Sequence, residues 1–241
     1  MLLQTEGLEK RFGGVVAVRG VTLSVAANEL VGIIGANGAG KTTLFAMIAG
    51  NQRPSAGTIT FDGQRIDGLS PDMVSRRGIA RTFQIVRPFP SLTVLENVEI
   101  GALFGTRQER SQTIARERSK AILDQVGLGS RADVLASDLT LAGRKRLEVA
   151  RALATEPKIL MLDEVLAGLT PTEVDEAVAM IRAVKTRFNL TIVMVEHVLR
   201  AVMQLCERVI VLHHGEKIAE GTPVQVSNDP AVISAYLGTK K

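Results

Sequence analysis

The chain has 241 residues, of which 46% are hydrophobic, so it is long enough to bury a sizeable core as one large α/β domain or two small ones. Aromatic residues make up only 3%, which indicates a core of aliphatic side chains, as in buried parallel strands and the helices that cover them. The formal net charge is +4, but 29 basic residues are spread among 25 acidic ones. The densest basic groups have no aromatic neighbours suited to stack on bases, which argues against a nucleic-acid-binding protein.

No apolar run approaches the ~18 residues that a membrane-spanning helix needs, and charged residues interrupt the N-terminal segment before any signal-type apolar region. We therefore expect a protein that remains in the cytoplasm. The single cysteine, Cys206, lies among Val202, Leu205 and Val209. This setting predicts a small buried hydrophobic residue rather than a redox or metal-binding one, and one cysteine excludes a disulfide framework.

The first third of the chain reads as short strands separated by turn residues. The predicted strands cover residues 2–3, 15–18, 21–25 and 58–61, the last closed by Asp62-Gly63. Together they predict an antiparallel sheet.

Within this region an apolar run, residues 30–34, leads into Gly35-Ala36-Asn37-Gly38-Ala39-Gly40-Lys41-Thr42, which matches the phosphate-loop pattern G-x-x-x-x-G-K-[ST] at every position. The glycines allow several backbone N–H groups to point at one phosphate chain, and the following helix adds the positive end of its dipole. Lys41 is expected to be an exposed cation that pairs only with phosphate, and Thr42 to hold Mg²⁺. A glycine-rich turn with an accidental lysine is the alternative, which the complete match disfavours. The predicted nucleotide-binding residues of this segment are Gly35, Asn37, Gly38, Ala39, Gly40, Lys41, Thr42 and Thr43.

From about residue 93 to residue 134, apolar residues recur at three- and four-residue spacings, which predicts helices. We expect one domain over residues 1–241, with a helical subdomain at about 93–155 inserted in its core.

Parallel-sheet character returns in two apolar runs, residues 159–162 and 191–195, separated by a predicted helix over 171–187. Thr170-Pro171-Thr172-Glu173 has the pattern of a capping box at the start of that helix. A helix over 199–205, a strand over 209–212, a hairpin at 215–216 and a terminal helix near 231–237 are predicted to follow.

Acidic residues follow the first of these buried strands directly, as Asp163-Glu164. The carboxyl ends of parallel strands are where such folds bind ligands, so Asp163 could join a Mg²⁺ shell and Glu164 could polarise a water in line with a γ-phosphate. The second strand ends in Glu196-His197, and His197 could bond the γ-phosphate or that water. Two solvated acids and a structural histidine are the alternatives.

The chain resembles the ATP-binding-cassette (ABC) ATPases along essentially its whole length. The resemblance rests on motifs that occur in that family's order. They are the phosphate loop, Gln84 in Arg81-Thr82-Phe83-Gln84, a helical region, the segment from Leu139 to Leu153, Asp163-Glu164 and His197. The resemblance implies the α/β fold of a P-loop NTPase core with an antiparallel β subdomain and an inserted helical subdomain. It also implies that ATP and Mg²⁺ are the cofactors, that Gln84 touches Mg²⁺ and senses a membrane partner, and that Phe12 stacks on adenine unless it is an ordinary core residue.

Two segments depart from the family's pattern. The usual signature is L-S-G-G-Q, whereas this chain has Leu139-Thr140-Leu141-Ala142-Gly143. We predict that a helix begins here and that the Thr140 hydroxyl and the Ala142 N–H still bind a γ-phosphate held by the opposite subunit. Leu141 fits only if its φ is negative. After Asp163-Glu164 the chain also has Val165 and Thr170 where the family commonly has proline and aspartate.

Within the family, the chain is most similar to ATPases of branched-chain amino-acid importers, through Arg81-Thr82-Phe83-Gln84, residues 92–98, Ala167-Gly168-Leu169, Glu220-Gly221-Thr222-Pro223 and Ala235-Tyr236-Leu237-Gly238. Transport of urea, short amides or lipopolysaccharide is the alternative within the family. The resemblance implies a homo- or heterodimer with a second ABC ATPase, two integral-membrane permease subunits and, indirectly, a periplasmic binding protein, with no nucleic acid. The ATPase would lie on the inner face of the cell membrane.

Two other function classes share this nucleotide chemistry. Mechanical ATPases of DNA repair carry a long coiled coil with a Cys-x-x-Cys hook, and those of translation carry two cassettes, neither of which occurs in the sequence. A degenerate nucleotide-binding scaffold is disfavoured because Glu164 and His197 are both present.

Overall fold

The computed structural model describes residues 1–82, 88–107 and 109–237. The chain divides into two compact units, a first unit of residues 1–74 and 193–241 and a second unit of residues 75–192. The strand β8 (Thr191–Val195) carries the chain from the second unit back to the first.

The first unit contains the predicted antiparallel sheet, with the strand order β2-β1-β4-β5. Its strands are β1 (Leu3–Phe12), β2 (Val15–Val25), β4 (Ala56–Phe61) and β5 (Gln64–Arg65).

Two strand predictions in this sheet were too short. The strand expected at 2–3 extends to Phe12. The prediction stopped early because charged residues interrupt the alternation of apolar and polar residues along the strand. The segments expected at 15–18 and 21–25 form one strand that passes through Gly20, whose φ of 60° only glycine adopts readily. Irregular register between β1 and β2 absorbs this distortion.

The rest of the first unit contains the apolar run that precedes the phosphate loop. Here β3 pairs in parallel with β9, and β10 pairs antiparallel with β9. The elements are β3 (Leu30–Ile34), α1 (Lys41–Ile48), α7 (Leu199–Leu205), β9 (Arg208–His213), β10 (Glu216–Gly221), α8 (Pro223–Ser227) and α9 (Pro230–Leu237). The helix α2 (Pro71–Arg76) runs across the division into the second unit.

Cys206 is buried beside β3, as predicted. A β-carbon on Gly32 would lie 2.8 Å from the cysteine Sγ, so the close approach of strand and thiol requires glycine. Burial is the main cause that raises the pKa of Cys206 to about 12, which makes the thiol a poor nucleophile.

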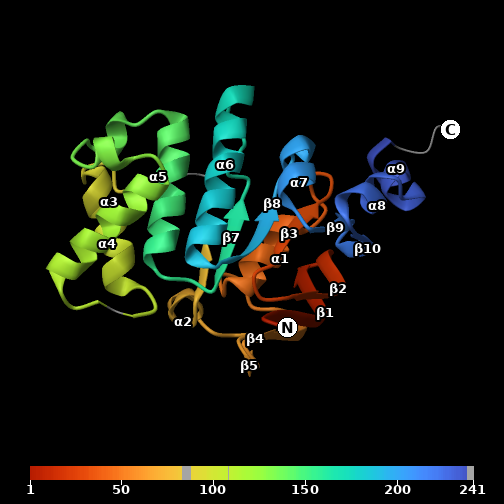
Figure 1. Ribbon diagram of the computed structural model, residues 1–241. Coiled ribbons are helices and arrows are strands. Elements are labelled where there is room, and N and C mark those ends of the chain that lie inside the picture. Colours follow the sequence, from red (N-terminus) through yellow and green to blue (C-terminus); the bar gives the residue numbers. More distant parts are fainter. Residues whose placement is uncertain (83–87, 108, 238–241) are drawn as a thin grey trace. The chain divides into compact units, whose positions relative to one another are not determined.

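The second unit pairs β6 (Ile79–Arg81) in parallel with β7 (Ile159–Asp163). Its helices are α3 (Val94–Phe104), α4 (Gln112–Gln125), α5 (Leu141–Ala154) and α6 (Pro171–Phe188), with short 3-10 turns η1 (Gly129–Arg131) and η2 (Ala136–Asp138). The helices α3, α4 and α5 pack against one another, and all three fall within residues 93–155, the range predicted as a helical subdomain (Figure 1). A subdomain boundary at about residues 93 and 155 stays a prediction.

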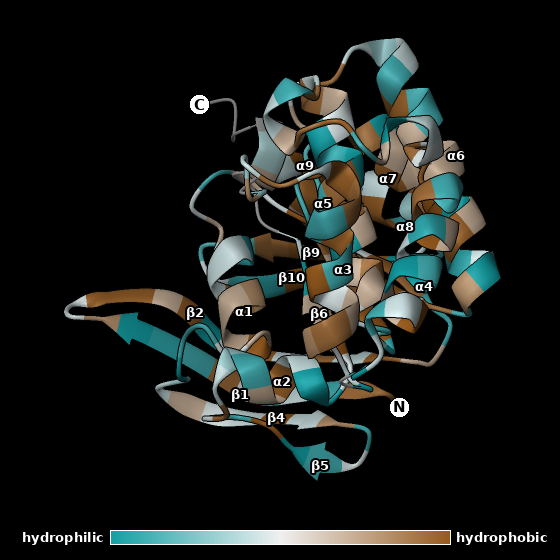
Figure 2. Ribbon diagram, turned by 90° about the vertical axis from the view of Figure 1, so that its left-hand side faces the viewer, coloured by the Kyte–Doolittle hydropathy of each residue, from teal (hydrophilic) through white to brown (hydrophobic). Residues whose placement is uncertain are grey.

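Capping side chains mark where helices begin in the second unit. Thr170 and Glu173 form the predicted capping box at the start of α6, and Thr93 and Glu96 form another at α3. Along α5, hydrophilic and hydrophobic residues both occur, and its Leu147, Val149 and Leu153 are buried (Figure 2). An amphipathic helix of this kind stabilises the unit through its buried face.

Candidate nucleotide-binding and catalytic site

The phosphate loop follows the buried strand β3 and needs glycine at two tight points. A β-carbon on Gly35 would lie 2.3 Å from the carbonyl oxygen of Leu212, and one on Gly40 would lie 2.5 Å from that of Ala17. Gly38 stands in open space, but its φ of 80° belongs to the left-handed region that favours glycine. The three glycines therefore bend the loop and let the backbone pack closely.

The loop ends at the start of α1, where the N-cap residue Gly40 offers no side chain to its N–H groups. The exposed tip of the loop comprises Ala36, Asn37 and Gly38, whereas Ala39 is buried and accepts a hydrogen bond from the N–H of Gly215. Uncapped N–H groups and the helix dipole attract an anion, so this end of α1 fits a phosphate group. In the first turn, Thr42 is exposed and Thr43 is half-buried.

Lys41 differs from its prediction as an exposed cation. The residue is 5% exposed, and its Nζ donates hydrogen bonds to the carbonyl oxygens of Gly35 at 2.7 Å and Ala36 at 3.0 Å. A buried ammonium group needs such partners, and the carbonyls of the loop that it closes supply them. A phosphate bound in the loop would compete with these carbonyls for the ammonium protons.

Asp163 ends the buried strand β7, and its side chain is only 1% exposed. The guanidinium of Arg81 donates to Asp163 Oδ2 at 2.7 Å, and the N–H of Asp163 donates to the hydroxyl of Thr82 at 3.0 Å. Among the described residues, no group hydrogen-bonds the buried Oδ1. A buried carboxylate oxygen with no protein partner fits the water shell of a Mg²⁺ ion.

Glu164 follows with a φ of 51°, in the left-handed region that side chains rarely adopt. Such a conformation costs on the order of 1–3 kcal/mol and is common at active sites. Its carbonyl oxygen accepts hydrogen bonds from the Nζ of Lys145 at 2.8 Å and from the N–H of Ala167 at 3.2 Å. Because Asp163 and Glu164 are both buried, the alternative of two solvated acids is wrong.

The signature segment forms the predicted helix start. Thr140 is the N-cap residue of α5, and its hydroxyl accepts a hydrogen bond from the N–H of Gly143 at 3.2 Å. Leu141 is not among the residues with positive φ, so its side chain causes no backbone strain. The N–H of Ala142 lies in the first turn of α5, where the helix dipole favours a negative group.

Phe12 ends β1 at the surface and is 47% exposed, so its alternative as a core residue is wrong. The Nζ of Lys10 lies 4.9 Å from the centre of its ring. An exposed ring next to a cation is available to stack on a planar ligand, and a role for Phe12 in binding adenine stays a prediction.

His197 follows β8 and is exposed, whereas the preceding Glu196 is buried. Gln84 lies outside the described residues. The first unit therefore carries the phosphate loop, Phe12 and His197, and the second carries Thr140, Ala142, Asp163 and Glu164.

Sequence reasoning missed two cations of the second unit, Arg81 and Lys145. Both lie inside recognisable motifs, Arg81 in Arg81-Thr82-Phe83-Gln84 and Lys145 in the segment after the signature. Nothing in those motifs indicated which acidic group or carbonyl each cation would contact.

Comparisons with known proteins agree with these motifs. The family model described as "ABC transporter" matches residues 18–167, and the model "Branched-chain amino acid ATP-binding cassette transporter" matches residues 216–241. The chain is 41% identical to the high-affinity branched-chain amino acid transport ATP-binding protein LivG of Escherichia coli K12, over 98% of both chains.

Two solved structures are also similar. A nucleotide-free ATP-binding cassette from an ABC transporter superposes with a TM-score of 0.88 at 30% identity, covering 98% of this chain and 99% of that one. A dimeric ATP-binding cassette in a post-hydrolysis state, bound to ADP and Pi, gives a TM-score of 0.82 at 26% identity, covering 92% of this chain and 98% of that one. In the described part of the chain, no helix has the length and apolar character needed to cross a bilayer.

Proposed function

Because the chain belongs to the ABC transporter ATP-binding family, we propose that it is the ATP-hydrolysing subunit of an importer of branched-chain amino acids. The family binds ATP and couples its hydrolysis to transport. The single observation that carries the substrate is the 41% identity to LivG over 98% of both chains. The C-terminal match to a branched-chain amino-acid transporter model supports the same substrate class.

Nucleotide binding is assigned to the phosphate loop and Phe12. The N–H groups from Gly35 to Thr43 surround the phosphates, Lys41 turns from its carbonyl partners to the β- and γ-phosphates, and Phe12 stacks on adenine. Exchange of carbonyl partners for phosphate keeps the ammonium of Lys41 hydrogen-bonded throughout.

Catalysis is assigned to Glu164 and His197. When bound, Mg²⁺ neutralises charge on the phosphates, and Thr42, Asp163 and Gln84 are the residues that would hold it. Glu164 accepts the proton of the attacking water, and His197 donates a hydrogen bond to the γ-phosphate.

The partner assignments follow from the family. ABC ATPases work as dimers, and here the second subunit is a copy of this chain or a related ATPase. Thr140 and the Ala142 N–H contact the γ-phosphate bound by that partner. Two permease subunits hold the dimer at the inner face of the membrane, and a periplasmic binding protein delivers the substrate to them.

Permease docking is assigned to the segment from Gln84 to Leu92. Within it, Phe89 is exposed, and its backbone is fixed to α3 by Asn97, whose side chain accepts from the Phe89 N–H at 2.8 Å and donates to its carbonyl at 3.0 Å. A fixed backbone that presents an exposed aromatic ring suits a docking surface.

Uptake of radiolabelled leucine into proteoliposomes that contain the chain, its permeases and the binding protein tests the function. Wild-type protein should drive ATP-dependent uptake, and Lys41→Ala should abolish both uptake and ATP binding because it removes the phosphate-binding cation. The circular dichroism spectrum of the variant should stay that of a folded protein. Uptake of urea, an amide or lipopolysaccharide instead of leucine would overturn the substrate, and full uptake with Lys41→Ala would overturn the site.

A further inference from the structure

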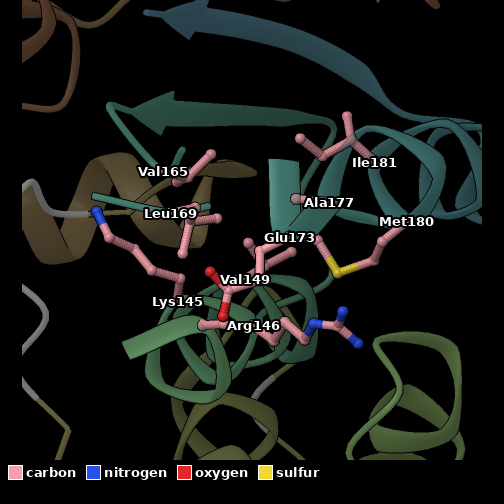
Figure 3. A pocket seen from close by; sticks show the side chains of 10 residues that line it. Lys145, Arg146, Val149, Val165, Leu169, Glu173, Ala177, Met180 and Ile181 are labelled. Atoms are coloured by element: carbon pink, nitrogen blue, oxygen red, sulfur yellow. The ribbon is translucent and has the colours of Figure 1, made fainter. Parts of the chain in front are cut away.

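The helix α5, which begins at the signature, contacts the segment after β7 in the same chain. The Nζ of Lys145 donates to the carbonyl oxygen of Glu164 at 2.8 Å. At the start of the helix, the Cδ2 atom of Leu141 would lie 3.1 Å from a β-carbon on Gly168. Between these contacts α5, α6 and the segment after β7 line a small pocket, with Val165 and Leu169 on the side of that segment (Figure 3).

Lys145 is unusual for a lysine because it is buried, at 7% exposure. Within the described residues, the ammonium group of Lys145 donates a hydrogen bond to the carbonyl oxygen of Glu164, and no carboxylate forms an ion pair with it. A buried ammonium loses its water, so its remaining bond is strong and directional. The neighbouring cation Arg146 leaves α5 in a different direction and pairs with Glu176 (Figure 3).

The carbonyl group that accepts the hydrogen bond from Lys145 belongs to Glu164, the residue with the strained backbone. With φ at 51°, Glu164 keeps its backbone conformation only while surrounding contacts maintain it. Relaxation of this backbone would turn the peptide plane and redirect the Glu164 carboxylate.

We propose that Lys145 is a positioning residue that fixes the backbone of Glu164 and couples it to the signature of the same subunit. This inference rests on the proposed roles of Glu164 and Thr140. Thr140 and Ala142 contact the nucleotide of one site, whereas Glu164 serves the other site. Lys145 lies one helical turn beyond Leu141, so a shift of the helix start on nucleotide binding moves the ammonium that holds Glu164. The two ATP sites of a dimer are thereby linked through α5.

Three variants test the positioning role by steady-state ATPase kinetics of the complex with its permeases. Lys145→Met keeps the aliphatic stem and removes the donor, and kcat should fall about 10-fold or more, since small misplacement of a catalytic group is costly. The KM for ATP should stay within about twofold, because the phosphate loop is untouched. Lys145→Arg restores a cationic donor and should recover most of the turnover. Arg146→Met is the matched control and should leave kcat within about twofold.

The outcomes separate this inference from the proposed function. Turnover of Lys145→Met equal to wild type, or equal to that of Arg146→Met, would overturn the positioning role while Glu164→Gln still abolishes turnover. If Glu164→Gln leaves turnover intact, the proposed function itself fails. Thermal unfolding shows whether each variant folds. If Lys145→Met does not fold, the positioning role is judged from the kcat of Lys145→Arg compared with that of Arg146→Met.

A double-mutant cycle with Thr140→Ala tests the coupling to the signature. If the signature and Lys145 act on Glu164 through the same helix, the fold-loss in kcat of the double variant should be much smaller than the product of the fold-losses of the two single variants. Losses in kcat that multiply would show that the two residues act independently and would contradict the coupling.

Discussion

At the scale of single residues, the least expected contact is the buried ion pair between Arg81 and Asp163. Removing one partner of such a pair leaves an uncompensated buried charge, which costs about 3–5 kcal/mol. We therefore predict that Arg81→Leu lowers the free energy of unfolding by about that amount, measured by urea denaturation. Arg116→Leu, which breaks an exposed pair with Glu99, is the control and should cost about 0–1 kcal/mol. Equal losses for the two variants would show that the Asp163 carboxylate does not depend on Arg81.

The residues proposed to carry the chemistry were identified from the sequence, but their surroundings could not be. The phosphate-loop pattern requires glycine at positions 35 and 40, and the positive φ angles there agree with it. Arg81 and Asp163 are 82 positions apart, and no local pattern identifies a partner at that distance. The prediction for Lys41 was wrong for a related reason, since the sequence does not indicate that loop carbonyls fold over the ammonium group.

At the scale of elements, Thr140 has two separable roles as the cap of α5 and as a proposed phosphate ligand. Thr140→Ala should lower the free energy of unfolding by about 1 kcal/mol through loss of the cap. It should also slow ATP hydrolysis and weaken ATP-driven dimerisation, while the affinity of the monomer for ATP stays nearly unchanged. Stopped-flow ATP binding, turnover with the permeases and light scattering measure the three effects.

The control for Thr140→Ala is the same substitution at a threonine that caps another helix. Thr222 caps α8 with the same hydroxyl geometry, so Thr222→Ala should cost similar stability and leave turnover unchanged. If the two variants behave alike in turnover and dimerisation, the signature hydroxyl is only a cap.

Elements with strong end signals were the predictable ones. The capping box fixed the start of α6, and the helix at 199–205 and the strand at 191–195 have the predicted bounds. β1 was missed over most of its length because the charged residues Glu6, Glu9, Lys10 and Arg11 interrupt its apolar pattern.

At the scale of the whole molecule, the chain carries one phosphate loop and one signature, so we expect each ATP to need the second subunit of a dimer. ATP binding should favour the closed dimer and hydrolysis should open it, which is a shift of population between two states. The order of the motifs made the family and its fold predictable. The arrangement of α3, α4 and α5 depends on packing among distant segments, so the sequence predicted helices there but not how they pack.

The most direct test of the central claim is turnover and association of Glu164→Gln. If Glu164 is the base that polarises the attacking water, the variant should lose about 10²-fold or more in turnover while its affinity for ATP is kept. Light scattering in the presence of ATP should then show a dimer that accumulates because it cannot hydrolyse its nucleotide. Undiminished turnover together with a monomer at saturating ATP would contradict the account.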